Sequence, residues 1–446
     1  RFVVETDYDR MPPEAVNAAK RAMLDTIGVT LAGSAEPQGR IVARLAARSG
    51  CKPVAGIIGG KLRVSCADAA LANGTAGHAL DYDDTGAGSQ GHPSVPVMPA
   101  AFALGEEVGA SGKEAIAAYI LGVEVWSRVA YRMPGLHMKG WHPTATFGTL
   151  GAAAAAAKIL RLNVQQTVMA LGIAGSEAGG LMQNFGTMTK PFHAGNAARN
   201  GVVAALLARD GFTATDAILE GEWGFPLTFY GHQEVDVLKM ADNLGAPFAV
   251  VSPGINVKKY PACFGTHRSI DAMLQLIREH NVRPDEVAAV DSRVPPRMEK
   301  VLFHTSPCTG LEGKFSMQFC MAVALTDRRV GLSQVNDARV NDPAIRELMK
   351  KVKIGVHADW VEGNSTEARP DIVTVKLKDG REYSLGVDKA KGHADVPLTR
   401  DELLTKYREC ARLALVDNDV ERSIELVENL EKLKNIKELL DVVVGR

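Results

Sequence analysis

Residues 144–160 read Thr-Ala-Thr-Phe-Gly-Thr-Leu-Gly-Ala-Ala-Ala-Ala-Ala-Ala-Lys-Ile-Leu, and this stretch decides the fold class. It has the length and composition of a helix, and glycine and alanine recur as densely in residues 172–180 and 194–205. Small side chains let the axes of neighbouring helices approach closely. The sequence therefore predicts a tightly packed helical domain.

Helical patterns continue outward from this stretch over most of residues 12–250. Near the start, Val16, Ala19, Met23, Ile27 and Leu31 recur every three or four residues, as expected of one buried helix face. Further helices are predicted over residues 41–48, 65–80, 95–108, 112–132, 164–174, 195–209 and 214–219.

The pattern changes after residue 256. Helices are predicted over residues 266–279, 314–326 and 342–351, and strands over 287–294, 352–356, 372–377 and 382–387. The last two strands flank Asp379-Gly380, which is typical of a hairpin turn. Thr399-Arg400-Asp401-Glu402 matches the capping box that begins a helix, so the last part of the chain returns to helices.

This order of elements predicts a mainly α protein. We expect a large all-helical domain made from residues 1–256 and 395–446, with a smaller α+β domain of residues 257–394 inserted into it. A chain of 446 residues is also long enough for two or three domains.

Composition disfavours several classes of protein. Lys plus Arg is 51 and Asp plus Glu is 52, so nothing favours nucleic acid or a membrane surface as a partner. The long uncharged stretches 85–105 and 140–157 are proline-interrupted or mostly alanine, and no transmembrane helix is predicted. Six cysteines without a C-x-x-C pair indicate no disulfide framework or zinc site. Residues 1–34 do not resemble a signal peptide, so we expect a cytoplasmic protein.

The first candidate site combines acidic residues with a histidine. The segment Gly77-His78-Ala79-Leu80-Asp81-Tyr82-Asp83-Asp84-Thr85 places three carboxylates at a helix C-terminus, where negative charge is unfavourable. His92 follows in a Gly-rich loop that suits a functional side chain. A solvated helix end is the alternative. A terpene-cyclase D-x-D-D motif is disfavoured because only 6% of residues are aromatic, and no phosphate-binding motif supports a diphosphate Mg²⁺ site.

The second candidate is His142, in Gly140-Trp141-His142-Pro143-Thr144. The proline begins a helix and holds the backbone of the histidine. Histidine titrates near neutral pH, which suits a general base. The alternative is a histidine that only packs or caps the helix.

The third candidate lies in residues 184–200. We expect Lys190 and Arg199 to lie across a turn from each other, with Pro191 stopping one helix and Gly195 resuming another. A lysine at such a position gains nothing from the helix dipole but suits an anion bound at the helix N-terminus. The sequence therefore predicts a substrate that carries a carboxylate.

Three candidates fall in the second half of the chain. His267 begins a helix near the domain junction, where ligand pockets tend to form. Cys263, four residues earlier, is a weaker candidate, because a lone cysteine is more often a small buried apolar residue. Lys314 begins a helix and is a candidate for binding a substrate carboxylate, with an ordinary surface lysine as the alternative.

Together these segments resemble the MmgE/PrpD family, whose members include 2-methylcitrate dehydratase, cis-aconitate decarboxylase and iminodisuccinate epimerase. The resemblance covers essentially the whole chain. It rests on G-H-A-L-D-Y-D-D-T followed by G-H-P-S (residues 77–94), G-W-H-P-T (140–144), G-T-M-T-K-P-F-H-A-G-N-A-A-R-N-G (186–201) and K-K-Y-P-A-C-F-G-T-H (258–267). It implies a large helical domain, a smaller lid domain, a homodimer and an active site between the domains.

The resemblance also implies active-site positions. By similarity to the decarboxylase members these are Asp81, Thr85, His92, His142 and Lys190. Where those members have a histidine after Pro-Ala this chain has Cys263, and the tyrosine of their lid is not evident in residues 297–303. Both differences argue against cis-aconitate decarboxylation. Residues 186–191 and 313–316 look closer to the epimerase pattern.

The reactions of this family share a carbanion-like or enolate-like species beside a carboxylate. Such a step needs a base, an acid and fixed positive charge. His92 and His142 are the candidate base and acid, and the candidate carboxylate ligands are Lys190, Arg199 and Lys314. No metal or organic cofactor is expected, and the absence of clustered cysteines argues against an iron–sulfur route.

The sequence therefore predicts a cofactor-independent lyase that acts on a small di- or tricarboxylate by removing a proton next to a carboxylate. A dehydratase like 2-methylcitrate dehydratase is the first choice, and an epimerase of an amino or imino dicarboxylate, like iminodisuccinate epimerase, is the second. Asp81 would orient a histidine or handle the proton. The alternative of another class is a non-catalytic helical binding scaffold. The substrate, its stereochemistry and the identity of the base stay open.

Overall fold

The structure is a computed structural model that describes residues 1–231, 235–361 and 369–445. The chain divides into two compact units. Unit 1 comprises Arg1–Asn184, Met188–Val257 and Thr399–Arg446, and unit 2 comprises Phe185–Thr187 and Lys258–Leu398. Both ends of the chain thus belong to unit 1. Nothing in the sequence pattern indicated that residues 185–187 would cluster with unit 2.

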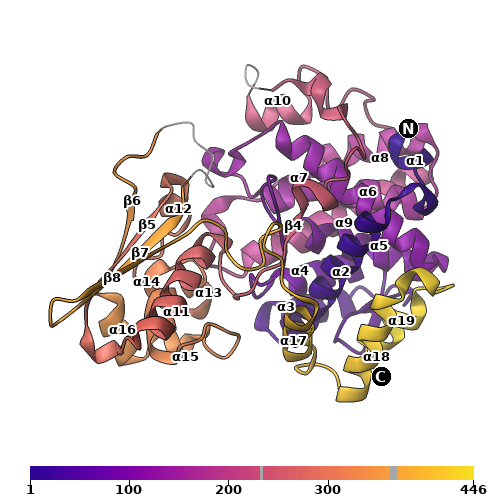
Figure 1. Cartoon of the computed structure of the whole chain (residues 1–446). Helices are drawn as coiled ribbons and strands as arrows, with labels where there is room; N and C mark the ends of the chain where they lie inside the picture. Colours follow the sequence, from indigo (N-terminus) through magenta and orange to yellow (C-terminus); the bar gives the residue numbers. More distant parts are fainter. Residues whose placement is uncertain (232–234, 362–368, 446) are drawn as a thin grey trace. The chain divides into compact units, whose positions relative to one another are not determined.

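Unit 1 consists mainly of helices, coloured indigo to magenta and yellow in Figure 1. Its helices are α1 (Phe2–Glu5), α2 (Pro13–Ser34), α3 (Pro37–Ala47), α4 (Cys66–His78), α5 (Ser94–Val108), α6 (Gly112–Tyr131), α7 (Pro143–Ile159), α8 (Val164–Ser176), α9 (Thr189–Arg209), α10 (Phe225–Tyr230), α17 (Arg400–Ala411), α18 (Asp417–Glu428) and α19 (Lys437–Val443). Two short antiparallel pairs join them, namely β1 (Ala55–Ile57) with β2 (Leu62–Val64) and β3 (Thr85–Gly86) with β4 (Ile255–Asn256). The predicted mainly α fold is confirmed.

Small residues let the central helices of unit 1 pack closely, as the sequence predicts. In α7 every residue from Pro143 to Ala157 is buried. Where α4 crosses α9, a Cβ on Gly74 would lie 2.7 Å from the Cα of Gly195, and a Cβ on Gly195 would lie 2.2 Å from the carbonyl oxygen of Leu71. Since neither position has room for a methyl group, these glycines set how closely α4 approaches α9.

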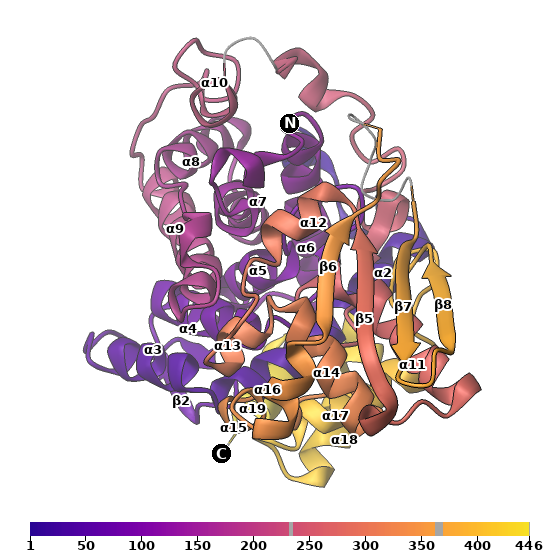
Figure 2. The same ribbon diagram turned by 90° about the vertical axis from the view of Figure 1, so that its left-hand side faces the viewer.

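Unit 2 contains a four-stranded sheet in the order β6-β5-β7-β8, seen in Figure 2. Its strands are β5 (Val287–Val294), β6 (Val352–Val356), β7 (Asp371–Leu377) and β8 (Glu382–Val387), and its helices are α11 (His267–His280), α12 (Pro296–Val301), α13 (Gly310–Gly313), α14 (Met317–Asp327), α15 (Asp337–Val340) and α16 (Pro343–Met349). β5 pairs with β6 in parallel, and the other pairs are antiparallel. Apolar residues of α11 and α14, including Ile270 and Phe319, form one core with Val290 and Val373 of the sheet.

The structure confirms several predicted elements and where they begin or end. β5 and β6 begin and end at the predicted residues. The hairpin turns at Gly380, whose φ of +91° suits glycine. In the capping box of α17, the Thr399 side chain accepts from the Glu402 N–H, and the Glu402 side chain accepts from the Thr399 N–H.

Two predictions about helices of unit 1 are wrong. Helix α9 begins at Thr189 and runs through residue 195 without a turn, because Pro191 lies in the first helical turn, where its missing N–H is not needed. Residues 214–219 form no helix. There the Thr215 hydroxyl accepts from the Ala217 N–H at 3.2 Å, a local bond that competes with helix formation.

Across the described residues, no helix is both long enough and apolar enough to cross a lipid bilayer.

Candidate active site

A cluster of titratable side chains forms in unit 1 where α4 ends and α7 and α9 begin. His78 is the last residue of α4, His142 caps the N-terminus of α7, and Lys190 lies in the first turn of α9. The close α4–α9 crossing brings the last turn of α4 near the start of α9. Three segments far apart in the sequence, namely the end of α4 with the loop of residues 81–92 and the starts of α7 and α9, therefore contribute to one buried site.

Lys190 lies between a carboxylate and an imidazole. Its Nζ is 2.7 Å from Oδ1 of Asp81 and 2.7 Å from Nε2 of His78, and the residue is only 4% exposed. Asp81 has a φ of +50°, an uncommon conformation for a non-glycine residue that often marks functional sites. Because an ammonium group only donates hydrogen bonds, Nε2 of His78 is the acceptor.

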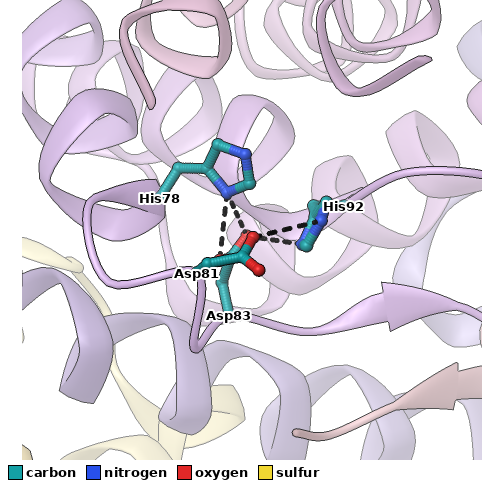
Figure 3. Close-up of side chains that lie close together, drawn as sticks. All are labelled: His78, Asp81, Asp83 and His92. Carbon is teal, nitrogen blue, oxygen red and sulfur yellow. Dashed lines mark hydrogen bonds and ion pairs between the residues drawn. The ribbon is translucent and has the colours of Figure 1, made fainter. Parts of the chain in front are cut away.

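Asp83 lies between two imidazoles, as Figure 3 shows. Nδ1 of His78 is 2.9 Å from one Asp83 oxygen, and Nδ1 of His92 is 3.0 Å from the same oxygen. Nε2 of His92 lies 3.7 Å from Oδ1 of Asp81, and the two imidazole rings meet edge to face with centroids 4.5 Å apart. Burial alone would raise the pKa of Asp83, but the two imidazoles hold that pKa well below its ordinary value. Asp83 is therefore ionised at neutral pH.

His78 is a neutral imidazole. Burial lowers its pKa to about 3, and the nearby Lys190 ammonium lowers it too, while Asp83 acts in the opposite direction. Since Nε2 accepts from Lys190, the single proton of the ring is on Nδ1 and is donated to Asp83.

A second pair of imidazoles adjoins His78. His142 stacks on it with ring centroids 5.6 Å apart, and Nδ1 of His142 is 3.1 Å from Nδ1 of His193. Burial, with Lys190 next in importance, lowers the pKa of His142 well below its ordinary value and that of His193 to about 4. The cluster therefore presents at least three neutral imidazoles around one ammonium group.

The third carboxylate of the acidic segment has a structural role. Asp84 accepts from the backbone N–H of Ser94 at 3.4 Å and from the Ser94 hydroxyl, at the start of α5. Burial raises its pKa well above the ordinary value. Asp81 and Asp83 thus share His92 in the cluster, whereas Asp84 bonds to Ser94 at the start of α5.

A buried lysine from the C-terminal part of the chain holds this loop. Lys406 of α17 donates to the carbonyl oxygen of Tyr82 at 2.8 Å, and its Nζ lies 3.9 Å from the centroid of the Tyr82 ring. The same ammonium forms a 2.6 Å ion pair with Asp25 of α2. Because Tyr82 stands between Asp81 and Asp83, Lys406 fixes the backbone that presents both carboxylates.

The cluster also contains enough donors for a metal ion. One ligand atom each from His78, Asp81, Asp83 and His92 lies within 4.8 Å of the others, and imidazole with carboxylate is a donor set that divalent cations use. However, the Lys190 ammonium already contacts Asp81 and His78, and it would repel a cation in the same space. The donor atoms suit a metal ion, but the positive charge of Lys190 disfavours one.

Of the predicted site residues in unit 1, Thr85 and Arg199 do not contact the cluster through any described interaction. Thr85 is half-buried, and its hydroxyl accepts from the Asn256 side chain at 3.2 Å across the β3–β4 pair. Arg199 is exposed. It follows Lys190 by nine residues on one continuous helix, and at about 100° per residue the two side chains point in opposite directions. The expected turn that would have brought them together is absent.

The other predicted site residues belong to unit 2. His267 is buried, with Nε2 3.2 Å from the carbonyl oxygen of Ala262 and its ring edge to face with Tyr260. The half-buried Cys263 donates its backbone N–H to the carbonyl oxygen of Lys314 at 2.9 Å. These three predicted residues thus gather in one part of unit 2. Their participation in catalysis stays a prediction.

The sequence analysis missed His78, Asp83 and His193 as site residues. Each stands inside a motif that it singled out, and two have a readable signal. His78 is the one titratable residue in the last turn of an otherwise small and apolar helix. His193 follows Lys190 by three residues, a spacing that puts both on one helix face.

Comparisons with known proteins cover nearly the whole chain. The family model of the MmgE/PrpD N-terminal domain matches residues 1–238, and that of the MmgE/PrpD C-terminal domain matches residues 260–432. Cis-aconitate decarboxylase of Homo sapiens is 31% identical, covering 96% of this chain and 90% of the relative. Cis-aconitate decarboxylase of Aspergillus terreus is 27% identical, covering 98% and 93%. The chain therefore belongs to the MmgE/PrpD family.

Proposed function

We propose that this protein is a cofactor-independent lyase that acts on a small di- or tricarboxylate. One observation carries the proposal: the buried Lys190 ammonium lies 2.7 Å from both a carboxylate and a neutral imidazole, with two further neutral imidazoles beside them. Neutral imidazoles accept protons, and a fixed cation stabilises the negative charge that develops on a substrate.

The proposed reaction begins with loss of a proton from a carbon next to a carboxylate. The proton goes to a histidine, with His142 and His92 as the candidates, and the electron pair forms an enolate-like anion near Lys190. In a dehydration, that pair then forms the C=C bond while the hydroxyl group leaves with a proton from an acid. One well-placed donor to such an oxyanion contributes about 3 kcal/mol, which is within reach of a buried ammonium.

Elimination of water, as in 2-methylcitrate dehydratase, is the first candidate reaction. Cys263 supports this reaction, because the resemblance places a histidine of the decarboxylase members at this position. Decarboxylation is the second candidate, because the relatives from Homo sapiens, Mus musculus and Aspergillus terreus are named cis-aconitate decarboxylases. In that reaction the electron pair comes from the C–CO₂ bond, CO₂ leaves, and a histidine that has taken a proton from solvent gives it to the carbon. Epimerisation, which returns the proton to the same carbon, is the remaining alternative.

One experiment separates these reactions. The purified protein is incubated in D₂O with citrate, 2-methylcitrate, malate, aspartate-derived dicarboxylates and cis-aconitate, and the products are followed by proton NMR and by release of CO₂. New alkene signals without CO₂ support dehydration, and CO₂ release supports decarboxylation. Deuterium uptake without either supports epimerisation.

The same experiment tests the enzyme against a non-catalytic scaffold. His142→Ala is expected to abolish turnover of the reactive acid while circular dichroism stays unchanged. His280→Ala, which removes an exposed imidazole from unit 2, is the matched control and should leave turnover intact. No reaction with any of these acids would contradict the proposal and favour the scaffold.

The proposal includes a homodimer, as the resemblance implies. Light scattering coupled to size exclusion should give twice the chain mass of 47.6 kDa, and a monomer at all concentrations would contradict this part alone.

A further inference from the structure

His193 has a defined place in the cluster but no part in the reaction described above. It lies one turn after Lys190 on α9, is 8% exposed, and has its ring centroid 5.3 Å from that of His142. Gly180 lies against both residues. Its carbonyl oxygen accepts the backbone N–H of His142 at 2.9 Å, and a Cβ on Gly180 would lie 3.3 Å from Nδ1 of His193. Both residues therefore pack against the same loop residue.

The hydrogen bond between these rings joins two atoms of the same kind, Nδ1 of His142 and Nδ1 of His193, at 3.1 Å. A neutral imidazole donates from one nitrogen and accepts at the other, so one Nδ1 must carry the proton and the other must lack it. If His142 donates, its Nε2 has no proton and is a base. If His193 donates, Nε2 of His142 carries the proton and is an acid.

We propose that His193 is a positioning residue that sets which ring nitrogen of His142 carries the proton, through the Nδ1–Nδ1 hydrogen bond. This rests on the proposed function, in which His142 exchanges a proton with the substrate. His193 itself does not touch the reacting atoms in this scheme.

The arrangement also gives the substrate proton a path. When Nε2 of His142 takes a proton, its Nδ1 proton crosses to Nδ1 of His193, and the positive charge moves with it. His142 is then neutral again and carries a proton on Nε2, ready to act as the acid, and the reverse transfer restores the base. His142 is the more strongly disfavoured of the two as a cation, because it is the more deeply buried, with the Lys190 ammonium next in importance. The charge therefore rests on His193.

Kinetics of two substitutions test this role. His193→Leu replaces the imidazole by an apolar side chain of similar size that makes no hydrogen bond. We expect kcat to fall by about 100-fold with KM within about twofold, as for loss of general acid–base function. His193→Asn can place an amide nitrogen or oxygen near the position of Nδ1. It restores the hydrogen bond but cannot hold the transferred proton, so it should recover about tenfold of that loss and not the whole. His280→Leu is the matched control and should leave both constants unchanged.

The pH profile of kcat adds a readout that a purely structural role would not move. In the wild type, the profile should follow the coupled pair. In His193→Leu the acidic limb should shift, because His142 then titrates beside Lys190, His78 and His92 without the coupled ring of His193. An unchanged profile with unchanged kcat would overturn the proposal.

A measurement without turnover separates failure of this proposal from failure of the proposed function. Nitrogen-15 NMR of histidine-labelled protein distinguishes the two tautomers of each ring. We expect the tautomer ratio of His142 to change by at least about fivefold between the wild type and His193→Leu, with His193→Asn nearer the wild type. If the ratio is the same in all three proteins, the proposal is wrong, whether or not the enzyme acts on any acid. If the ratio changes but no acid reacts, control of the tautomer stands and the proposed function fails.

Discussion

Each unit of the protein buries a polar cluster, and burial shifts the pKa values of the two clusters in opposite directions. In unit 2, Asp371 forms a 2.5 Å ion pair with Arg268 and accepts from the Ser269 hydroxyl at 3.0 Å, yet burial raises its pKa to about 6. In unit 1, burial lowers the pKa of His78 to about 3 and that of His193 to about 4. In both places burial favours the uncharged form.

The comparison separates a structural cluster from one suited to chemistry. With a pKa of about 6, Asp371 is mostly ionised at neutral pH, and its oxygens are already used by Arg268 and Ser269. A neutral imidazole at neutral pH is a base that is ready to react. Unit 1 adds to its imidazoles the single ammonium of Lys190, which holds a charge where an anionic intermediate would form.

Removal of that ammonium should have the largest effect. We expect Lys190→Met to lower kcat/KM by about 10²- to 10³-fold, because it deletes the fixed positive charge while keeping the length of the side chain. Arg209→Met, at the exposed end of the same helix, is the matched control. A loss of less than tenfold in a folded Lys190→Met protein would show that the cluster is structural, like that of unit 2.

The stability of unit 1 should fall in acid. His193 has an ordinary pKa near 6.5 when unfolded and about 4 when folded, so the unfolded state binds the proton first as the pH drops. Its contribution is complete above pH 6.5 and is lost between pH 6.5 and 4, by up to about 3 kcal/mol. Hydrogen exchange of the slowest amides of α9, corrected for intrinsic rates, should show this slope in the wild type and a shallower one in His193→Asn. Equal slopes would contradict the assignment.

Unit 2 should respond with the opposite sign. The pKa of Asp371 rises from an ordinary 3.8 to about 6 on folding, so between these values the folded state binds more protons. Its contribution therefore weakens as the pH rises from 3.8 to 6, by about 2 to 3 kcal/mol. Exchange of the slowest amides of β7 should report this trend, and Asp371→Asn should remove it. A unit 2 that gains stability over this range would break the comparison.

Substitution of Arg199 should have a small effect. Arg199→Ala is expected to change kcat/KM by less than about twofold, since an exposed side chain on the far side of α9 from Lys190 contributes little. A loss of tenfold or more would restore the sequence-based prediction that Arg199 binds a substrate carboxylate.

Removal of metal should have the smallest effect of all. Because Lys190 supplies the positive charge, dialysis against EDTA is expected to leave kcat and the melting temperature unchanged. Loss of activity that a divalent cation restores would show that the His78, Asp81, Asp83 and His92 donors bind a metal after all.

The sequence predicted best what depends on neighbours along the chain. The strands predicted over residues 287–294 and 352–356 are β5 and β6, the Asp379-Gly380 pair located a hairpin, and the Thr399 capping box located α17. The prediction of a helix over residues 214–219 was wrong, because a helical pattern of six residues is too short to outweigh a local side-chain hydrogen bond.

The site was predictable only in part, because its geometry depends on contacts between distant segments. Lys190, His92 and His142 stand in motifs that are unusual in themselves, and the structure brings them together. His78 and His193 become significant only through Lys190 and His142, which lie across helix crossings that no local pattern specifies. Arg199 was misplaced because Pro191 was interpreted as a stop, whereas a proline in the first turn allows the helix to continue.

The buried contact of Lys406 with the Tyr82 carbonyl has a consequence for synthesis of the protein. All the imidazoles of the cluster lie within residues 78–193, but the group that fixes the loop of Asp81 and Asp83 is added more than 200 residues later. On the ribosome, the helices that carry Lys190 and the histidines would emerge before Lys406, so Asp81 and Asp83 would meet their side-chain partners first. The hydrogen bond from Lys406 to the backbone between the two carboxylates would form only after α17 has been made, and a chain terminated before α17 would lack that support.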